Sequence, residues 1–313
     1  MVDNPVFIGD RPEMTDPLAE IVTLLQPSAG FSKLVEYAGR WRIRRDVESK
    51  PVYFAVLEGE CRVVSKSHQP ILLHAGDFVL LPASSDQIIE SIDAPPHGIA
   101  MTPVELDQGR FRIGRTGKDV NLRMQVGICS FAAPDAALLV SLLPTMVVAR
   151  GEPRLATLMQ LVGDETRQAR PGRALVLERL LEVLLIEAFR CGTDTTSVPS
   201  VARGLSDLRL VVALRAMHAR PSYGWTVAEL AAEAAMSRSV FFARFSRTVG
   251  LPPMEYLLSW RMALAKRLLL TQELAIEHVA ARVGYGSAST FSTAFTRHVG
   301  MPPIRYARTA TSD

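Results

Sequence analysis

Arginine and serine side chains recur at a fixed spacing in the last third of the chain. Ser239 and Arg247 are matched, at a shift of 50, by Ser289 and Arg297. A guanidinium donates several hydrogen bonds at once and suits phosphate oxygens, and a serine hydroxyl both donates and accepts. From residue 203 onward the sequence carries 14 Lys and Arg against 7 Asp and Glu, whereas the first 202 residues carry 21 against 25. This asymmetry favours a polyanion as the partner of the C-terminal third, and the alternative is a basic face that only contacts water.

Residues that could perform catalysis or bind a metal do not stand at the required spacings. The six histidines form no HxH or HExxH pair, and the three cysteines form no CxxC pair. The sequence also contains no GxSxG and no complete P-loop. We therefore predict no catalytic residue, no cofactor and no resident metal, and we expect that the protein is not an enzyme.

A duplicated segment must position the recurring side chains. The nine residues VGLPPMEYL at Val249–Leu257 return as VGMPPIRYA at Val299–Ala307, and matching residues continue upstream of both copies. The shift is 50 from Ser239 onward and 49 before the preceding turn, so the second turn contains one additional residue. Duplication of one structural unit is the simplest explanation.

Each copy reads as a helix, a tight turn and a second helix. In the first copy Thr226 and Glu229 have the spacing of a capping box, and Ser237 precedes the second helix as a cap. The second copy has Ala275 where a capping Ser or Thr is expected, so its first helix should be capped less well. The two predicted units span residues 226–249 and 275–299.

The repeated sequence VGxPPxxY separates consecutive helices. Gly250 can end one helix in a left-handed conformation, and Pro253 suits the first turn of the next. A helix predicted at Met254–Leu270 would join the two units. Two short helices on a basic segment are typical of a helix-turn-helix. Two such units on one connecting helix can enter successive major grooves, about 34 Å apart on one face of a DNA duplex.

Residues 203–308 resemble the DNA-binding domain of AraC-type transcription regulators. The resemblance is carried by WTVAELAAEAAMSRSVFFARF, GLPPMEYLLSWRMALAKRLL and VAARVGYGSASTFSTAFTRHVGMPPIRY. It implies a sequence-specific, one-component transcription regulator that binds double-stranded promoter DNA and contacts RNA polymerase. We expect an activator, and repression remains the alternative.

The resemblance also implies roles for particular residues. Ala243 and Thr293 stand where the family often has arginine, so methyl contacts and DNA shape should contribute more of the specificity. Arg244, one position further round the helix, cannot simply replace that arginine. For Phe242 the alternative is packing in the core, and for each exposed arginine it is solvation. The positions that resemble base-reading ones are Arg238, Ser239, Phe242, Ala243, Ala288, Ser289 and Thr293, and the expected phosphate contacts are Arg247, Lys266 and Arg297.

The N-terminal part reads as a β structure. Residues 31–130 alternate short apolar runs with turns, which is typical of a sandwich or barrel, and a break between strands is expected at Glu58-Gly59. The phrase GDFVLLPASSDQ at residues 76–87 resembles the second motif of cupins, which are double-sheet jelly rolls. Residues 16–190 resemble the cupin-type sensory half of such regulators, which implies that this half senses an effector or a condition.

The predicted fold class is α+β with two domains. The first is an N-terminal β jelly roll, cupin-like, with following helices, and the second is an all-α double helix-turn-helix. The predicted boundaries are residues 1–191 for the sensory and dimerisation domain, 192–205 for a polar linker and 206–310 for the DNA-binding domain.

A cupin enzyme would hold a metal through histidines. Aligned on the second motif, its histidine position is Gln87, and the usual HxH falls on Asp46 to Glu48. A metal-dependent cupin enzyme with a DNA-binding appendage remains the alternative function, with Asp46 and Glu48 as candidate ligands. Redox sensing through Cys61 or Cys129 is a third hypothesis, against burial of both as small apolar residues.

Residues 174–189 form a leucine-rich but charged helix. We expect Leu177, Leu181 and Leu184 to form a homodimer interface, and packing against the barrel is the alternative. The segment is too short and too charged to span a bilayer, and the N-terminus lacks the regions of a signal peptide. We therefore expect a cytoplasmic homodimer with no membrane partner, which binds promoter DNA and a small-molecule effector.

Overall fold

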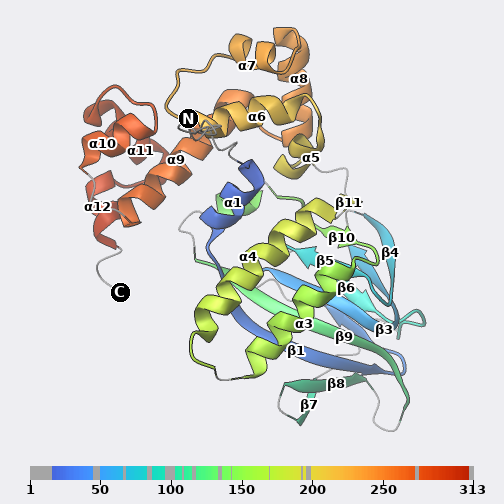
Figure 1. Ribbon diagram of the computed structural model, residues 1–313. Helices are drawn as coiled ribbons and strands as arrows, with labels where there is room; N and C mark the ends of the chain where they lie inside the picture. The colour runs from blue at the N-terminus through green and yellow to red at the C-terminus, as the bar shows by residue number, and fades with distance from the viewer. Residues whose placement is uncertain are drawn as a thin grey trace, which may run out of the picture. The chain divides into compact units, whose positions relative to one another are not determined.

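The computed structural model describes residues 16–309, except 45–49, 66–67, 83–86, 96–102, 108, 115–117, 133–135, 142, 169, 192, 195–198 and 272–274. The chain divides into two compact units, residues 21–203 and residues 204–313 together with the residues up to Glu20. We call them the N-terminal unit and the C-terminal unit (Figure 1). Two helices contain the boundaries between them, α1 (Pro17–Leu25) and α5 (Val201–Ser206).

The N-terminal unit is built on one curled, largely antiparallel sheet with helices against it. Its helices are α2 (Ala136–Ser141), α3 (Pro153–Arg167) and α4 (Arg173–Cys191). Its strands are β1 (Pro27–Ala38), β2 (Arg42–Arg44), β3 (Val52–Ser65), β4 (His68–His74), β5 (Phe78–Leu81), β6 (Gln87–Glu90), β7 (Val104–Asp107), β8 (Arg110–Gly114), β9 (Val120–Phe131), β10 (Val147–Ala149) and β11 (Thr193–Asp194).

The long strand β3 holds the two halves of the sheet together. One half has the order β11-β10-β5-β3-β9-β1-β8-β7, and in the other β4 and β6 pair with β3 while β2 pairs with β6. The pair formed by β1 and β8 is parallel, and the other described pairs are antiparallel. This curled, strand-rich sheet with following helices confirms the predicted fold class of the first half.

The expected break at Glu58-Gly59 is a bend inside β3 rather than the end of a strand. Residues before the bend pair with β5 and β9, and residues after it pair with β4 and β6. Gly59 has a φ of 83°, and a Cβ there would lie 2.0 Å from the carbonyl oxygen of Asn121. Only glycine fits this position, and its conformation lets one strand serve both halves of the sheet.

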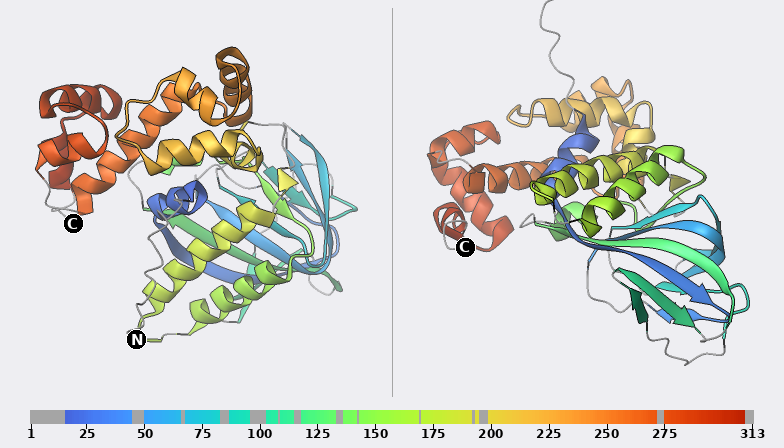
Figure 2. Two further views of the ribbon diagram at one scale, coloured as in Figure 1. Left: turned by 45° about the horizontal axis from the view of Figure 1, so that its top comes forward. Right: turned by 60° about the horizontal axis from the view of Figure 1, so that its bottom comes forward.

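The interior of the curled sheet is filled by apolar side chains. Trp41, Phe54 and Met124 are fully buried there, together with valines and leucines of the same strands. The opposite face of β1 and β9 is covered by helices (Figure 2). One contact there is made by the Gln125 amide, which donates to the Met159 carbonyl of α3 at 2.6 Å and to the Ser32 hydroxyl at 3.3 Å.

The prediction that three leucines of α4 lie on the surface as a dimer interface is wrong. Leu177, Leu181 and Leu184 of α4 are at most 4% exposed, and α4 packs against α3, β1 and β10. The leucine stripe is therefore used to attach α4 to the sheet, which was the alternative. A different side of α4 exposes Val176 and Val183.

Part of the predicted linker is ordered structure. Thr193 and Asp194 form β11, which pairs with β10 at the edge of the sheet, and α5 begins at Val201. The described residues therefore extend the N-terminal unit into the segment 192–205.

The C-terminal unit is entirely helical in its described part. Its helices are α6 (Leu210–Ala219), α7 (Val227–Glu233), α8 (Arg238–Val249), α9 (Pro253–Thr271), α10 (Ile276–Arg282), α11 (Ala288–Val299) and α12 (Pro303–Thr309). The pairs α7–α8 and α10–α11 are the two helix-turn-helix units, and α9 joins them as predicted. None of the described helices of the protein is long and apolar enough to cross a membrane.

The same aromatic packing lies behind α8 and α11. In the first copy the ring centroids of Phe241 and Phe245 are 5.5 Å apart, and those of Phe245 and Tyr256 are 5.8 Å apart. The second copy repeats this arrangement with Phe291, Phe295 and Tyr306. These four phenylalanines are fully buried, so the sequence repeat is in part a repeat of core packing.

The turns between the paired helices also correspond. Ala235 in the first turn has a φ of 51°, and Gly284, which matches it at a shift of 49, has a φ of 82°. A Cβ on Gly284 would lie 2.8 Å from the carbonyl oxygen of Ser222 and 2.9 Å from the Arg261 side chain. The second turn therefore requires glycine, whereas the first holds an alanine in the left-handed region at a cost of about 1 kcal/mol.

Candidate nucleic-acid interface

The first helix-turn-helix unit presents α8 with its predicted contact residues outward. Arg238, Ser239, Phe242 and Ala243 are all exposed, whereas Phe241 is fully buried. The core-packing alternative for Phe242 is therefore wrong. The side chains face solvent because the aromatic packing fixes the opposite side of the helix.

The capping box that begins this unit is present. The Thr226 hydroxyl accepts from the Glu229 backbone N–H at 3.2 Å, and the Glu229 carboxylate accepts from the Thr226 backbone N–H at 2.8 Å. Hydrogen bonds from Thr226, and one from the Tyr223 hydroxyl at 2.8 Å, lower the pKa of the Glu229 carboxyl. These bonds fix the start of α7, against which α8 is positioned.

The second unit presents α11 in the same way but with different end groups. Ser289 and Thr293 are exposed and Ala288 is half-buried. Ser287 caps α11 by accepting from the Thr290 backbone N–H at 3.1 Å. The Thr293 hydroxyl donates to the Ser289 carbonyl at 3.1 Å, so it is turned back onto its own helix.

Two of the cap predictions have opposite outcomes. Ala275 makes no side-chain cap at the start of α10, as predicted. Ser237 precedes α8, but its hydroxyl makes no cap hydrogen bond and lies 3.5 Å from the Ser239 hydroxyl instead. The prediction that Ser237 caps α8 by hydrogen bonding is therefore wrong, and only the second unit has a serine cap on its outward helix.

The prediction that Lys266 contacts a phosphate is wrong. Its side chain lies in α9 and the residue is only 7% exposed. Its ammonium lies 5.7 Å from the ring centroid of Tyr306. Lys266 therefore packs its cation on the aromatic core of the second unit and does not reach the surface.

Arg244 has a structural role. Its guanidinium pairs with the Asp207 carboxylate at 2.7 Å, and the same carboxylate accepts from the backbone N–H groups of Arg209 and Leu210 at the start of α6. Burial raises the pKa of the Asp207 carboxyl, but these hydrogen bonds outweigh it and lower that pKa. Arg244 therefore ties α8 to α6 and cannot substitute for a base-reading arginine at position 243.

Arg247 and Arg297 remain the candidates for phosphate contacts. Both are exposed in the last turns of α8 and α11 and occupy equivalent places in the repeat. Sequence reasoning missed the exposed pair Val240 and Thr290, which also match at a shift of 50. The sequence could have indicated Val240, because it stands seven positions before Arg247 and therefore lies on the same face of the helix.

Comparison with known proteins identifies the family. Residues 16–194 match the cupin family, and residues 230–309 match a helix-turn-helix domain family. A putative AraC-like transcription regulator of Streptomyces antibioticus is 33% identical over 282 residues, which are 88% of this chain and 92% of the relative. The chain belongs to the AraC-like transcription regulators.

Two further proteins are similar to this AraC-like regulator over most of its length. The HTH-type transcriptional regulator AlkR of Acinetobacter baylyi is 28% identical over 284 residues, covering 87% of this chain and 92% of AlkR. Among solved structures, ToxT from Vibrio cholerae is 13% identical, covers 92% of this chain and 99% of its own, and has a TM-score of 0.37.

The N-terminal unit of the regulator offers no reactive thiol at Cys61 or Cys129. Both side chains are fully buried, and burial raises the pKa of each thiol to about 12. Oxidants react with the thiolate form, which is scarce at neutral pH for such groups. The redox hypothesis is therefore disfavoured at both cysteines, which pack as small apolar residues.

Of the three positions at which a cupin enzyme would bind its metal, the structure describes one. Gln87 on β6 is 3% exposed and lies on the same face of the strand as the core residue Ile89. Asp46 and Glu48 lie outside the described residues. Within the described part of the chain, His, Cys, Asp and Glu form no group of three or more that could hold a metal ion.

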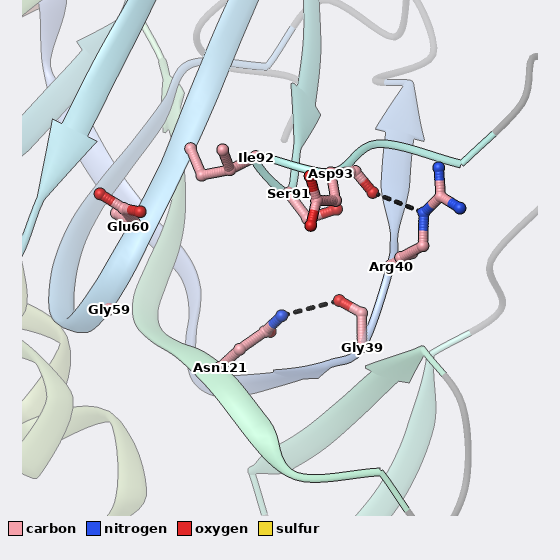
Figure 3. Close-up of a pocket in the computed structure, with 8 residues that line it drawn as sticks. All are labelled: Gly39, Arg40, Gly59, Glu60, Ser91, Ile92, Asp93 and Asn121. Atoms are coloured by element: carbon pink, nitrogen blue, oxygen red, sulfur yellow. Dashed lines mark hydrogen bonds between the residues drawn. The ribbon is translucent and has the colours of Figure 1, made fainter.

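A polar pocket of about 370 Å³ lies at one end of the barrel. It forms where the turn after β1, the bend of β3, the end of β6 and the start of β9 meet (Figure 3). Glu60, Asp93, Arg40 and Asn121 surround the same open space. Arg40 is held by the carbonyls of Asp93 and Ala94 at 2.9 and 2.8 Å, and the Asn121 amide donates to the Gly39 carbonyl at 2.7 Å.

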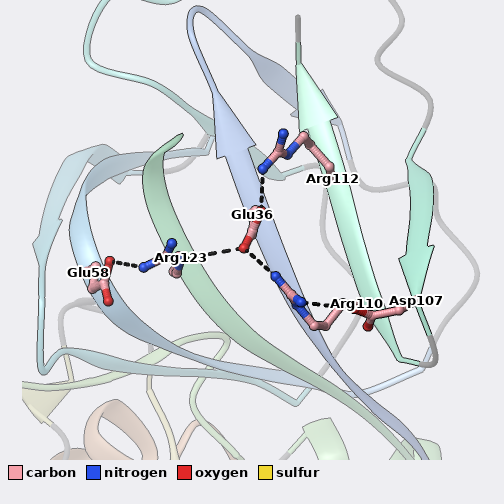
Figure 4. Close-up of polar contacts among 6 residues, drawn as sticks. All are labelled: Glu36, Glu58, Asp107, Arg110, Arg112 and Arg123. Atoms are coloured by element: carbon pink, nitrogen blue, oxygen red, sulfur yellow. Dashed lines mark hydrogen bonds and ion pairs between the residues drawn. The ribbon is translucent and has the colours of Figure 1, made fainter. Parts of the chain in front are cut away.

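A cluster of arginines on β8 and β9 is neutralised within the N-terminal unit (Figure 4). Glu36, 2% exposed, accepts from Arg112 at 2.7 Å and from Arg110 at 3.0 Å, and its carboxylate lies 3.5 Å from Arg123. These hydrogen bonds, led by that of Arg112, lower the pKa of the Glu36 carboxyl although burial opposes them. Glu58 and Asp107 pair with two of the same arginines. The cluster therefore joins neighbouring strands, and its arginines are paired with carboxylates of the same unit.

The two ends of α8 should contribute differently to DNA binding. Arg238 lies in the first turn, so Arg238→Ala should cost roughly 1–3 kcal/mol on the cognate site and relax the preference at one base pair. Arg247 lies in the last turn, so Arg247→Ala should weaken binding to cognate and random DNA alike. It should also flatten the slope of log K against log salt by about one. The measurement is a salt titration of binding to cognate and scrambled duplexes.

Arg297→Ala is the matched variant in the second copy. It should lower affinity without changing sequence preference, as Arg247→Ala does, because the repeat gives both arginines the same place. The assignment is contradicted if Arg247→Ala loses only cognate affinity while Arg238→Ala weakens both duplexes equally.

Proposed function

We propose that this AraC-like transcription regulator is a one-component regulator of promoter DNA. The C-terminal unit reads DNA through α8 and α11, and the N-terminal unit senses an effector and forms a homodimer. Family membership also supports contact with RNA polymerase and a cytoplasmic location as parts of the proposal. The protein is proposed to have no catalytic activity, and a stoichiometric metal in the purified protein would instead favour the cupin enzyme.

The observation that carries the proposal is the duplication of an outward helix on corresponding aromatic packing. The helix α9 joins the two units with 19 residues, and at 1.5 Å per residue it is about 28 Å long. Such a connector is comparable with the distance of about 34 Å between successive major grooves on one face of DNA. Two recognition helices in one chain can therefore bind as two half-sites.

Footprinting on a selected binding site tests this arrangement. The full-length protein, used to select from random duplexes, should recover a site with two protected stretches about 10 base pairs apart on one face. Ser239→Asp should abolish protection of one stretch and Ser289→Asp protection of the other, because a carboxylate is repelled by phosphates. Ala156→Asp, an exposed change in the N-terminal unit, is the control for added charge. A single protected stretch in the wild type would contradict the use of both helices.

We propose the polar pocket at the end of the barrel as the effector site. The interior of the sheet is filled by apolar side chains, whereas the pocket has two carboxylates, one guanidinium and one amide around an open space. The carboxylates of Glu60 and Asp93 outnumber the single charge of Arg40, so the electrostatics favour a small polar effector without a net negative charge.

Blocking the pocket should abolish the response to such an effector. Ile92 lines the pocket and is partly exposed, so Ile92→Trp should fill it without disturbing the core. In a thermal-shift panel of neutral, cationic and anionic metabolites, neutral or cationic compounds should stabilise the wild type but not this variant. Leu72→Trp, at an exposed leucine of β4, should respond like the wild type. Equal stabilisation of Ile92→Trp would place the effector elsewhere.

We propose that the homodimer uses the exposed side of α4. Val176 and Val183 are 43% and 44% exposed and lie seven positions apart, with the half-buried Leu180 between them. Residues with this spacing share one helical face, so they form a short apolar stripe on the surface.

Sedimentation of the intact protein tests the interface. The wild type should be a dimer, and Val176→Arg combined with Val183→Arg should be a folded monomer with the far-UV circular-dichroism spectrum of the wild type, because both positions are exposed. Gln160→Arg on α3 is the control and should remain dimeric. Leu181→Arg should instead destabilise the N-terminal unit, because it buries a charge. A dimeric double variant would exclude this face.

A further inference from the structure

Phe242 is a large apolar side chain on the outward side of α8. It is 45% exposed, whereas the phenylalanines at positions 241 and 245 of the same helix are fully buried. Isolated exposed apolar residues are common on protein surfaces, so exposure alone assigns no role. Its place in the repeat is informative, because the equivalent residue in the second copy is Ser292.

The fold does not require an aromatic ring at this position. Behind α8 pack Phe241, Phe245 and Tyr256. The corresponding three rings pack behind α11 together with Tyr285, which matches a methionine of the first copy, and a serine stands in place of Phe242. An aromatic ring that the packing does not need, on a helix that faces a ligand, is available for contact with that ligand.

The neighbours of Phe242 leave it as the largest side chain at the middle of the outward face. Ser239 and Ala243 beside it are small, and both are exposed. Arg244, the nearest arginine, is held by Asp207 at 2.7 Å. The middle of α8 therefore lacks the bidentate donor that would recognise guanine and presents apolar surface instead.

In the major groove the apolar feature of a base pair is the 5-methyl group of thymine. We propose that Phe242 is the specificity-determining residue of α8 and reads a thymine methyl group. The inference rests on the proposed function, in which α8 enters the major groove. It further implies that the two half-sites differ, since α11 has hydroxyl groups where α8 has the ring.

Removing the methyl group from DNA tests the contact directly. The probe is the duplex that the wild-type protein selects from random DNA, with each thymine replaced in turn by uracil. Burial of one methyl group corresponds to about a fourfold change in Kd, so the wild type should lose roughly 3–10-fold at one or two thymines of one half-site. Phe242→Ala should lose a similar factor on the thymine duplex and should not distinguish thymine from uracil at that position.

Two variants separate methyl reading from a general effect of the ring. Phe242→Leu keeps apolar contact and should retain part of the uracil penalty. Ser292→Ala, the equivalent change on α11, should show the full penalty of the wild type. The urea midpoint, followed by tryptophan fluorescence, should be unchanged in all three variants because neither position is in the core.

Two outcomes would overturn the inference while leaving the proposed function intact. One is a Phe242→Ala protein that binds DNA and keeps the wild-type uracil penalty, which would assign the methyl contact to another residue. The other is a wild type that binds its selected duplex without any uracil penalty. Failure of the wild type to select any sequence would instead contradict the proposed function itself.

Discussion

The packing of two phenylalanines and a tyrosine behind each outward helix is the interaction on which the exposed face of both helix-turn-helix units depends. In the first unit Phe241 and Phe245 lie on the inner side of α8 and contact Tyr256 of α9. The hydroxyl of Tyr256 lies 2.7 Å from Nε2 of His218 in α6, so the same ring also ties in the preceding helix. Because these contacts fix the rotation of α8 about its own axis, they determine that Ser239 and Ala243 face outward. Substitutions on the outer face can then change specificity without changing the fold.

A different constraint shapes the N-terminal unit. The sheet can curl into a barrel because β3 continues through the bend at Gly59, where no other residue fits beside the Asn121 carbonyl. The interior that results is filled mainly by apolar side chains, whereas the bend itself contributes to the pocket at the barrel end. The arginines of the outer face are meanwhile neutralised around Glu36. The excess of basic over acidic residues lies in the C-terminal third of the sequence, which carries 14 Lys and Arg against 7 Asp and Glu.

The sequence predicts local structure well where a residue has one reason to be present. Few roles other than starting or ending a helix suit the pair Thr226 and Glu229, Gly250 or the prolines after it. The helices begin and end where these residues predict. Residues that suit two environments were assigned wrongly. Lys266 is basic but lies on the ring of Tyr306, and the stripe that includes Leu181 is equally suited to a dimer and to the sheet. Which environment applies depends on tertiary contacts from distant segments, and no local pattern contains that information.

The two copies keep one scaffold but have diverged at several points that the packing leaves free, although Ser239 and Arg247 have the same residue types as Ser289 and Arg297. The first has a capping box and an alanine in a left-handed turn, and its outward helix carries Phe242 beside Ala243. The second has an uncapped first helix and a glycine turn, and presents Ser292 and Thr293 at the same places. Identical outward helices would bind a pair of half-sites in either order with equal affinity. Helices with different surfaces distinguish the two orders, so under the proposed function this divergence would set the direction of the regulator on its site. The two outward surfaces differ although the phenylalanine and tyrosine packing behind them corresponds.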